Sequence, residues 1–332
     1  MLFGLTEPTG VERYDLGGNA SIAYRKSTWL HLMSLSNIQR AVELWDSRID
    51  LHEFSYLHNP VFKCMDLEPE SDILLLIMVN SAPKNSEKRA YIRKTFGNAS
   101  AWPSHNGRSV MRIVFLLAAV SDRQLQDDVR FESLAFDDIV QESFVDNYLN
   151  MTRKTIMGMK WVTTFCRRAK FTMKVDDDVL INVPRVLTIL GNARRSNFSY
   201  GTVHWAKPVR RTTGNMQKFY TPRHVYPREM YPPYFNGHAY ILSTDVVEKV
   251  FHVSREIKLF PWSDVYVGMC LEKLGIRLRH SEQFCSVWFR MVNKTTFAES
   301  ENAVDIIREY VSVFHLSFQQ MNQLWDIWNR QL

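Results

Sequence analysis

The chain alternates between apolar runs and polar stretches from about residue 73 onward. Ile73–Val79 (ILLLIMV) is apolar throughout and predicts a buried strand, and the polar stretch after it leads into a helical pattern over Lys88–Phe96. A second apolar run, Ile113–Val120 (IVFLLAAV), predicts another buried strand. Strand, helix and strand in this order predict an α/β fold with a largely parallel sheet.

The middle of the chain continues this alternation. We expect a helix over Thr152–Cys166, with Thr152 as a candidate N-cap, and it leads into an apolar strand, Phe171–Val175 (FTMKV). Asn182 and Pro184 predict the start of another helix, PRVLTILGNARR, because asparagine caps helices well and proline suits the first turn. Residues 1–65 show no sustained period, so we interpret them as a stem-like, loosely packed extension ahead of a domain at 66–332.

The composition is that of a globular protein. Of 332 residues, 45% are apolar and 13% aromatic, and Lys plus Arg exceed Asp plus Glu by 41 minus 35, or six. No long basic block is present, so we expect no nucleic-acid partner, and the excess charge fits an anionic ligand or an ordinary solvated surface equally well. The longest apolar run is far shorter than the roughly 20 residues that span a bilayer, and no targeting segment is visible.

Cysteines and glycosylation sequons are compatible with the secretory pathway. The chain has four cysteines, which allow three complete pairings, and none of them forms a CxxC metal pair: Cys64, Cys166, Cys270 and Cys285. Asn-x-Ser/Thr sequons begin at Asn19, Asn98, Asn150, Asn197 and Asn293.

Three consecutive carboxylates, Asp176, Asp177 and Asp178, follow the predicted strand Phe171–Val175. Like charges at this spacing repel each other, but a divalent cation makes such a cluster favourable. Mg²⁺ and Mn²⁺ are typically held by one or two carboxylates plus phosphate oxygens, and open α/β sheets bind ligands where strands end. The alternative is a solvated acidic turn or a helix cap, which the apolar residues on both sides disfavour.

Five segments, in chain order, resemble the β1,3-galactosyl- and β1,3-N-acetylglucosaminyltransferases of glycosyltransferase family 31. These segments are KRAYIRKTFG (Lys88–Gly97), DDIVQESFVDNYLNMTRKT (Asp137–Thr155), KVDDDVLIN (Lys174–Asn182), YPPYFNGHAYILS (Tyr231–Ser243) and SDVYVGMCLEKLGI (Ser263–Ile276). The resemblance covers about residues 70–325. It implies that 66–332 is a GT-A type catalytic domain with a Rossmann-like mixed sheet flanked by helices, a UDP-sugar donor, and Mn²⁺ or Mg²⁺.

The same resemblance implies roles for the carboxylates. Asp176 would lie near the donor ribose, Asp178 would ligate the metal and bridge it to the UDP diphosphate, and Asp177 is the third, less defined member of the donor site. His315, in VFHLSFQQMNQLW, resembles the late histidine that completes the metal shell, and we prefer it to His280. A purely structural histidine is the alternative.

Two arginines and a glycine complete the implied donor site. Arg89 and Arg93 are four residues apart, so they share one helix face, and guanidinium groups suit phosphate recognition. The resemblance places both near UDP, whereas the alternative is a pair of exposed helix arginines. Gly237 is expected to allow the backbone to approach the donor sugar closely.

Asp264 is the candidate catalytic base. Transfer with inversion needs a carboxylate that removes the proton of the attacking hydroxyl, and in the family the aspartate of a Glu-Asp pair has this role. Here Ser263 replaces the glutamate, which removes one carboxylate from the acceptor pocket. The alternative for Asp264 is a helix cap, a role that is compatible with catalysis.

Aromatic residues near such a base are candidates for packing against sugar rings. We expect this of Trp262, Tyr231 and Tyr234, although most aromatic residues in a chain this rich in them belong to the core. Phe235 and Ala239 depart from the family pattern, in which cysteine and glycine are frequent at these positions.

The expected function is inverting transfer of a hexose, preferably galactose, from a UDP-sugar to a hydroxyl of an acceptor glycan on a glycoprotein or glycolipid, forming a β1,3 linkage. UDP-N-acetylglucosamine is the alternative donor. A catalytically inactive UDP-sugar-binding relative and a two-metal phosphoryl-transfer enzyme are the other hypotheses. The family implies the Golgi lumen, with membrane association only if an N-terminal anchor is missing from this chain. Loops such as Ala206–Arg228 are expected to shape the acceptor site.

Overall fold

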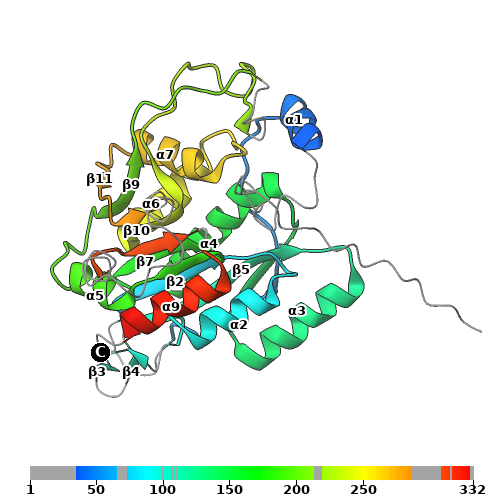
Figure 1. The fold of residues 1–332 in the computed structure, drawn as a ribbon. Coiled ribbons are helices and arrows are strands. Elements are labelled where there is room, and N and C mark those ends of the chain that lie inside the picture. Colours follow the sequence, from blue (N-terminus) through cyan, green and yellow to red (C-terminus); the bar gives the residue numbers. More distant parts are fainter. Residues whose placement is uncertain are drawn as a thin grey trace, which may run out of the picture.

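The computed structural model describes residues 35–65, 73–98, 101–102, 104–105, 108–109, 111–212, 219–285, 308–314 and 316–329 (Figure 1). Its helices are α1 (Leu35–Glu43), α2 (Ser86–Lys94), α3 (Arg123–Phe136), η3 (Tyr148–Asn150), α4 (Met151–Phe165), α5 (Val183–Gly191), α6 (Thr244–Ser254), α7 (Ser263–Lys273) and α9 (Phe318–Asn329). Its strands are β1 (Tyr56–His58), β2 (Leu75–Asn80), β3 (Ser104–His105), β4 (Arg108–Ser109), β5 (Met111–Ala119), β6 (Ile139–Val145), β7 (Phe171–Asp176), β8 (Val179–Ile181), β9 (Ser199–His204), β10 (Tyr234–Ser243), β11 (Arg279–His280), β12 (Phe284–Cys285) and β13 (Ser312–Phe314).

The main sheet has the strand order β1-β6-β5-β2-β7-β10-β9-β11. Strands β6, β5, β2 and β7 run parallel, whereas β10 runs antiparallel to both β7 and β9. Every residue of β2 is buried, as expected for a central strand covered on both faces. The α/β fold predicted from the apolar runs and the mixed sheet implied by the family resemblance are therefore confirmed, and each of those runs is a strand within two residues of its predicted bounds.

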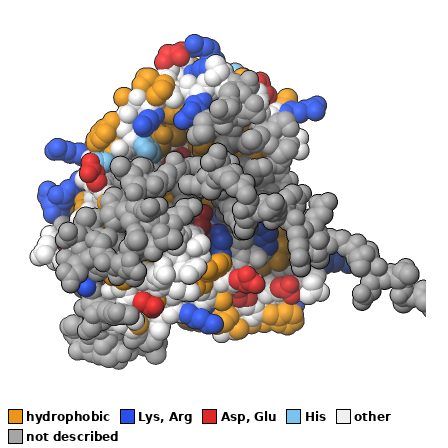
Figure 2. Space-filling view, in the orientation of Figure 1, with side chains coloured by type: hydrophobic (Ala, Val, Ile, Leu, Met, Phe, Trp, Pro, Cys, Tyr) orange, Lys and Arg blue, Asp and Glu red, His pale blue; other side chains and the backbone are white. Residues whose placement is uncertain are grey.

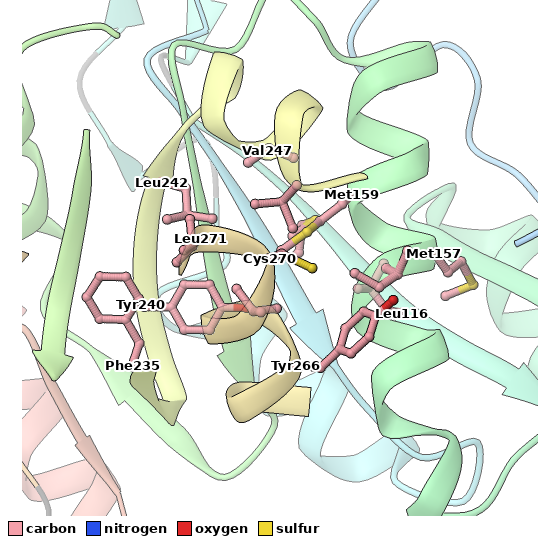
Figure 3. Packing of buried hydrophobic residues seen from close by; sticks show 14 of the residues in the cluster. Leu116, Met157, Met159, Phe235, Tyr240, Leu242, Val247, Tyr266, Cys270 and Leu271 are labelled. Atoms are coloured by element: carbon pink, nitrogen blue, oxygen red, sulfur yellow. The ribbon is translucent and has the colours of Figure 1, made fainter. Parts of the chain in front are cut away.

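Helices cover both faces of this sheet (Figure 1). Helices α4, α6 and α7 pack on one face, where Cys270 and Leu271 of α7 lie between β10 and α4 (Figure 3). Helices α2, α5 and α9 pack on the other. Alternate residues of β2 belong to the two cores, Leu76 to the first and Ile77 to the second, because successive side chains of a strand point to opposite faces.

A second, smaller sheet lies beside the end of β7. It has the order β12-β13-β8, and β8 begins three residues after β7 ends. Phe314 of β13 pairs with Val179 of β8 in antiparallel register. This pairing brings a C-terminal segment of the chain against the turn that holds the three aspartates.

Two predicted helix starts have different outcomes. Asn182 is the N-cap of α5 and accepts a hydrogen bond from the backbone N–H of Arg185, with proline in the first turn, so this prediction is confirmed. The prediction that Thr152 caps the next helix upstream is wrong, because α4 begins at Met151 after Asn150. The buried Thr152 hydroxyl instead donates to the carbonyl of Phe260, 2.7 Å away.

The described part of the N-terminal segment is not a loosely packed extension. Strand β1 pairs with β6, and Cys64 forms a disulfide with Cys166 at the end of α4. Ile38 and Val42 of α1 are fully buried in the core that contains α4 and α7. A three-residue strand and a nine-residue helix are too short to produce a clear period, so their tertiary contacts could not be inferred from the pattern.

Figure 2 shows charged side chains of both signs among the described residues of this face, which form no field of one sign there. This distribution fits the small excess of basic residues in the sequence. Among the helices that the structure describes, none has the length and apolarity needed to cross a bilayer.

Candidate active site

The candidate active site lies where the parallel strands end. The last residue of β2, Asn80, pairs with Asp176, the last residue of β7, so polar groups from two strands meet at one edge of the sheet. The Asn80 side chain is fully buried and donates to Thr155 on α4, while the backbone carbonyl of Asn80 accepts the N–H of Asp177. The predicted position of the aspartates at the carboxyl end of a strand is confirmed, and it is where open α/β sheets bind ligands.

Asp176 is bound by a lysine from its own strand. The Lys174 ammonium is buried and donates both to the Asp176 carboxylate and to the carbonyl of Gly237 on β10. Burial raises the pKa of Asp176, and the nearby Lys174 opposes that rise. Because one quarter of the Asp176 side chain is exposed, this carboxylate can still receive a ligand from the solvent side.

Asp177 is buried and fully engaged by the segment that follows β2. Its carboxylate accepts hydrogen bonds from the Ser81 hydroxyl at 2.8 Å, the Asn85 amide at 2.7 Å and the Lys88 ammonium at 2.9 Å. Only 1% of its side chain is exposed. These contacts give Asp177 a structural role, because they tie the turn after β7 to the loop that leads into α2.

Asp178 is half-buried in the turn between β7 and β8. Val179, the next residue, pairs with Phe314, and the ring of Phe314 stacks on His238 with centroids 3.7 Å apart. His315, the predicted metal ligand, lies outside the described residues. In the part of the chain that the structure describes, no three His, Cys, Asp or Glu side chains are grouped to hold a metal ion.

Arg89 is completely buried, and its contacts use all five N–H donors. They bind the Glu132 carboxylate twice, the Ser81 hydroxyl, and the carbonyls of Ala82 and Pro83. Arg89 therefore acts on the site through the loop after β2, which it holds in place beside Asp177. In this state it has no donor left for a phosphate.

The structure does not bring Arg93 to the aspartates. Arg93 forms a bidentate pair with Asp138, which precedes β6. This pair lies at the amino ends of the parallel strands, whereas Asp176 lies at their carboxyl ends. Its guanidinium also lies 4.0 Å from the ring centroid of Phe136. The placement of Arg93 near UDP by family resemblance has no support in this position.

Asp264 lies in the first turn of α7, next to Gly237. A Cβ at Gly237 would be 3.4 Å from both the Cβ and Oδ2 of Asp264, so no side chain separates this strand from the carboxylate. The other carboxylate oxygen, Oδ1, accepts the backbone N–H of Val265 at 2.8 Å. Helix α7 comes this close to β10 because of Gly268, where a Cβ would lie 2.6 Å from Cβ of Tyr234.

Aromatic residues surround Asp264. Burial, followed by the negative charge of Asp264, raises the pKa of Tyr148, Tyr234 and Tyr240, and burial raises that of Tyr231 to about 12. These phenols therefore remain protonated at neutral pH. Trp262 is buried, its ring centroid lies 6.3 Å from that of Tyr148, and its indole N–H donates to Thr221.

The departures from the family pattern fit the local packing. Phe235 is buried and stacks on Tyr240, with ring centroids 5.5 Å apart, and Ala239 is buried opposite Val175. Ser263 is half-buried at the start of α7.

His280 lies on β11, which β9 and β10 separate from the aspartates, and its Nδ1 accepts the N–H of Val203.

Two residues of the site escaped sequence reasoning. Lys174 links Asp176 to Gly237, and the only signal for it is a charged residue inside an otherwise apolar strand. Lys154 of α4 is buried and binds both Asp146 and the Ser81 carbonyl, which joins the ends of β6 and β2. Burial lowers the pKa of Lys154, and the adjacent Asp146 opposes this effect.

A mixed α/β sheet with an Asp-x-Asp turn at its carboxyl edge and a further carboxylate facing it is the arrangement of a GT-A glycosyltransferase. The family model described as Galactosyltransferase matches residues 87–282, and the chain belongs to this family. The match includes every described residue that the sequence assigned to the site.

Relatives support the same family. Beta-1,3-galactosyltransferase 1 of Mus musculus is 33% identical over 282 residues, which cover 84% of this chain and 79% of the relative. Lactosylceramide 1,3-N-acetyl-beta-D-glucosaminyltransferase A of Xenopus laevis is 35% identical over 231 residues, which cover 67% of this chain and 59% of the relative. Because the chain belongs to this enzyme family and resembles these relatives, it is a glycosyltransferase.

Two solved structures show a distant similarity to this chain. The galactosyltransferase LgtC in complex with donor and acceptor sugar analogues has a TM-score of 0.39 and 11% identity, covering 76% of this chain and 95% of that one. The apo structure of the bifunctional glycosyltransferase WbbM has a TM-score of 0.39 and 10% identity, covering 76% of this chain and 48% of that one.

Proposed function

We propose that this enzyme transfers galactose from UDP-galactose to a hydroxyl of an acceptor glycan, with inversion and formation of a β1,3 linkage. One observation carries the proposal: Gly237 lies against the base candidate and is joined to the donor-side carboxylate through Lys174. Its Cα faces Asp264, while its carbonyl accepts from Lys174, which also binds Asp176. A sugar bound over this glycine would have one carboxylate on each side.

The proposed reaction is a single displacement. The acceptor hydroxyl gives its proton to Asp264, its oxygen forms a bond to the anomeric carbon of the donor, and the bond from that carbon to the diphosphate breaks with its electrons on the leaving oxygen. Asp264 Oδ1 is held by the Val265 N–H, and Oδ2, the oxygen facing Gly237, is the atom that we propose takes the proton. The neighbouring neutral phenols of Tyr148 and Tyr234 can orient hydroxyl groups of the sugars.

The donor set at the end of β7 fits a divalent cation. Asp178 supplies a half-exposed carboxylate, and the β8–β13 pairing brings the strand that precedes His315 against the residue after Asp178. We propose that Asp178 and His315 hold Mn²⁺ or Mg²⁺, for which carboxylate and imidazole are suitable ligands. When bound, such a cation neutralises the charge that develops on the diphosphate.

Metal-dependent donor binding tests this proposal. UDP and UDP-galactose with Mn²⁺ are expected to raise the unfolding temperature of the wild type, because a ligand that binds only the folded state stabilises it by about 2.7 kcal/mol at 100 times its Kd. A chelator is expected to abolish the rise, and so is Asp178→Ala. Differential scanning fluorimetry with and without EDTA measures both effects.

A donor and acceptor panel separates the alternatives. Faster transfer from UDP-N-acetylglucosamine than from UDP-galactose would favour the activity named for the Xenopus laevis relatives. UDP binding without transfer to any acceptor glycan would identify an inactive relative. Hydrolysis of a phosphodiester without sugar transfer would support the two-metal hypothesis instead.

We further propose that the enzyme works in the lumen of the Golgi, on glycoprotein or glycolipid acceptors. The Cys64–Cys166 disulfide supports this, because disulfides persist in oxidising compartments and are rare in the cytosol. In protein from intact cells, alkylation without reduction is expected to leave Cys64 and Cys166 unlabelled, as mass spectrometry of the peptides would show. Labelling of both cysteines as free thiols would contradict the lumenal location.

A further inference from the structure

A cavity of about 390 Å³ lies between the N-terminal helix and the start of α4. We call it the α1–η3 cavity. It is lined by residues of α1 and the segment after it, and by residues of η3 and α4: Ala41, Leu44, Trp45, Asp46, Asn147, Leu149, Asn150 and Arg153. Its volume is that of a small-ligand site, and nothing in the proposed transfer reaction uses it.

The wall of the cavity formed by α1 is fixed to the segment that leads to the catalytic base. The Trp45 indole donates to the Leu259 carbonyl at 3.1 Å, and the Leu259 N–H donates to the Arg48 carbonyl at 2.8 Å. Ile49 forms a bridge with Lys258. The distance from Leu259 to Asp264 is only five residues along the chain, so α1 and the base belong to one packed unit.

The opposite wall is joined to the segment of the proposed base through Tyr148. Asn147 and Asn150 line the cavity, while Tyr148 between them packs near Trp262 and has its pKa raised by burial and by the charge of Asp264. Tyr148 thus lies between residues that line the cavity and the segment that carries the proposed base.

The proposed acceptor loop also reaches this side. The Glu43 carboxylate, at the end of α1, raises the pKa of Tyr220, and the ring of Phe219 lies 5.7 Å from that of Trp262. Phe219 and Tyr220 of this loop therefore lie near the segment that leads to Asp264 and near the end of α1.

The chemistry of the lining suits a carbohydrate. Trp45 is half-buried and offers a flat apolar ring, with its orientation fixed by the hydrogen bond to Leu259. Arg153 uses Nε on Asp50 and Nη1 on Asn150, and within the described residues its Nη2 makes no hydrogen bond. An aromatic face beside a fixed guanidinium and a side-chain amide recognises a ligand that alternates C–H faces with hydroxyl groups.

We infer that the α1–η3 cavity binds the sugar units of the acceptor beyond the one that bears the reacting hydroxyl. This inference rests on the proposed transferase function. The N-terminal helix α1 would then help to set which lengths of acceptor glycan the enzyme prefers. The aspartates of the proposed donor site lie on other elements.

Blocking the cavity tests the inference. The probes are two ladders of oligosaccharides of one to four units, one ending in galactose and one in N-acetylglucosamine. In the wild type, kcat/KM is expected to rise about tenfold between the one-unit and the four-unit acceptor, as one well-made contact provides. Ala41→Trp places an indole in the cavity and is expected to remove this gain, with kcat/KM for the one-unit acceptor within about twofold of the wild type.

Arg40→Trp is the matched control, since it puts the same side chain on an exposed neighbouring position of α1 that does not line the cavity. It is expected to keep the full gain with acceptor length. If Ala41→Trp lowers the unfolding temperature, Leu44→Trp replaces it, because Leu44 is 76% exposed and lies outside the core. An unchanged length dependence in the blocking variant, or none in the wild type, would overturn the inference.

The inference can be separated from the transferase proposal. If the wild type transfers sugar to no acceptor, saturation-transfer NMR with the same oligosaccharides and UDP measures their binding directly. Signals from inner sugar units that are present in the wild type and absent in Ala41→Trp would still support binding of these units in the cavity. No contact with any inner unit would count against it. A glycan found on Asn150 by mass spectrometry of secreted protein would also overturn it, because the protein's own sugar would then occupy the cavity.

Discussion

Asp264→Asn is expected to lower kcat by about 10²- to 10⁴-fold, the usual contribution of a positioned general base. Asparagine has nearly the same shape, and its side-chain oxygen can still accept the Val265 N–H that Asp264 Oδ1 accepts. The atom that changes is the one facing Gly237, where a proton acceptor becomes an amide. Steady-state kinetics with UDP-galactose and the best acceptor of the panel would measure the loss.

The experiment needs proof that only the chemical step has changed. UDP with Mn²⁺ should raise the unfolding temperature of Asp264→Asn as much as that of the wild type, since Asp264 does not belong to the donor-side turn. Ser263→Ala is the matched control, because it alters the preceding residue in the same first turn of α7 without removing a carboxylate. A rate for Asp264→Asn within a factor of ten of the wild type would exclude this residue as the base.

The strands and helices around the donor site could be predicted from the sequence because each is long and strongly apolar on its buried side. Strands β2, β5 and β7 are almost fully buried and therefore read as continuous apolar runs. Asn182 and Pro184 fixed the start of α5 through local chemistry alone. Such short-range signals located the aspartate turn at the end of a strand without any knowledge of the tertiary structure.

Contacts between distant segments could not be predicted in this way. The N-terminal segment has no clear period, yet a disulfide that spans 102 residues and a pairing with β6 bind it to the domain. The link from Lys174 to Gly237 joins residues 63 apart. Sequence spacing contains no information on such pairings, because they depend on the strand order of the finished sheet.

The directions in which side chains point explain the remaining differences between the predicted and the observed site. The four-residue spacing of Arg89 and Arg93 correctly placed both on one helix face, but it did not reveal that the carboxylate of Glu132 binds both guanidinium groups. Arg89 then reaches back to the loop after β2, while Arg93 pairs with Asp138 at the other edge. A motif that suggests phosphate binding therefore serves, in this state, to fix α2 against the sheet.

The adjacent carboxylates of the Asp-x-Asp turn are expected to differ sharply when each is removed. Asp177→Ala should lower the free energy of unfolding by about 3–5 kcal/mol, the cost of breaking a buried ion pair by deleting one partner. The change leaves the buried Ser81 hydroxyl and Asn85 amide without their carboxylate acceptor, and the Lys88 ammonium without its counter-ion. Urea unfolding followed by tryptophan fluorescence would measure the difference.

Asp177→Asn and Asp178→Ala make this prediction specific. Asparagine retains one side-chain oxygen for Ser81 and Asn85 but loses the charge opposite Lys88, so its loss of stability should be smaller than that of alanine. Asp178→Ala should abolish metal-dependent UDP binding with a smaller loss of stability, because Asp178 is half-buried whereas only 1% of the Asp177 side chain is exposed. Equal stability losses in the two alanine variants would contradict the structural role of Asp177. The expected contrast follows from burial: Asp177 is enclosed by protein donors and holds the turn together, whereas its neighbour Asp178 is half-buried and is the residue that we propose binds the cation.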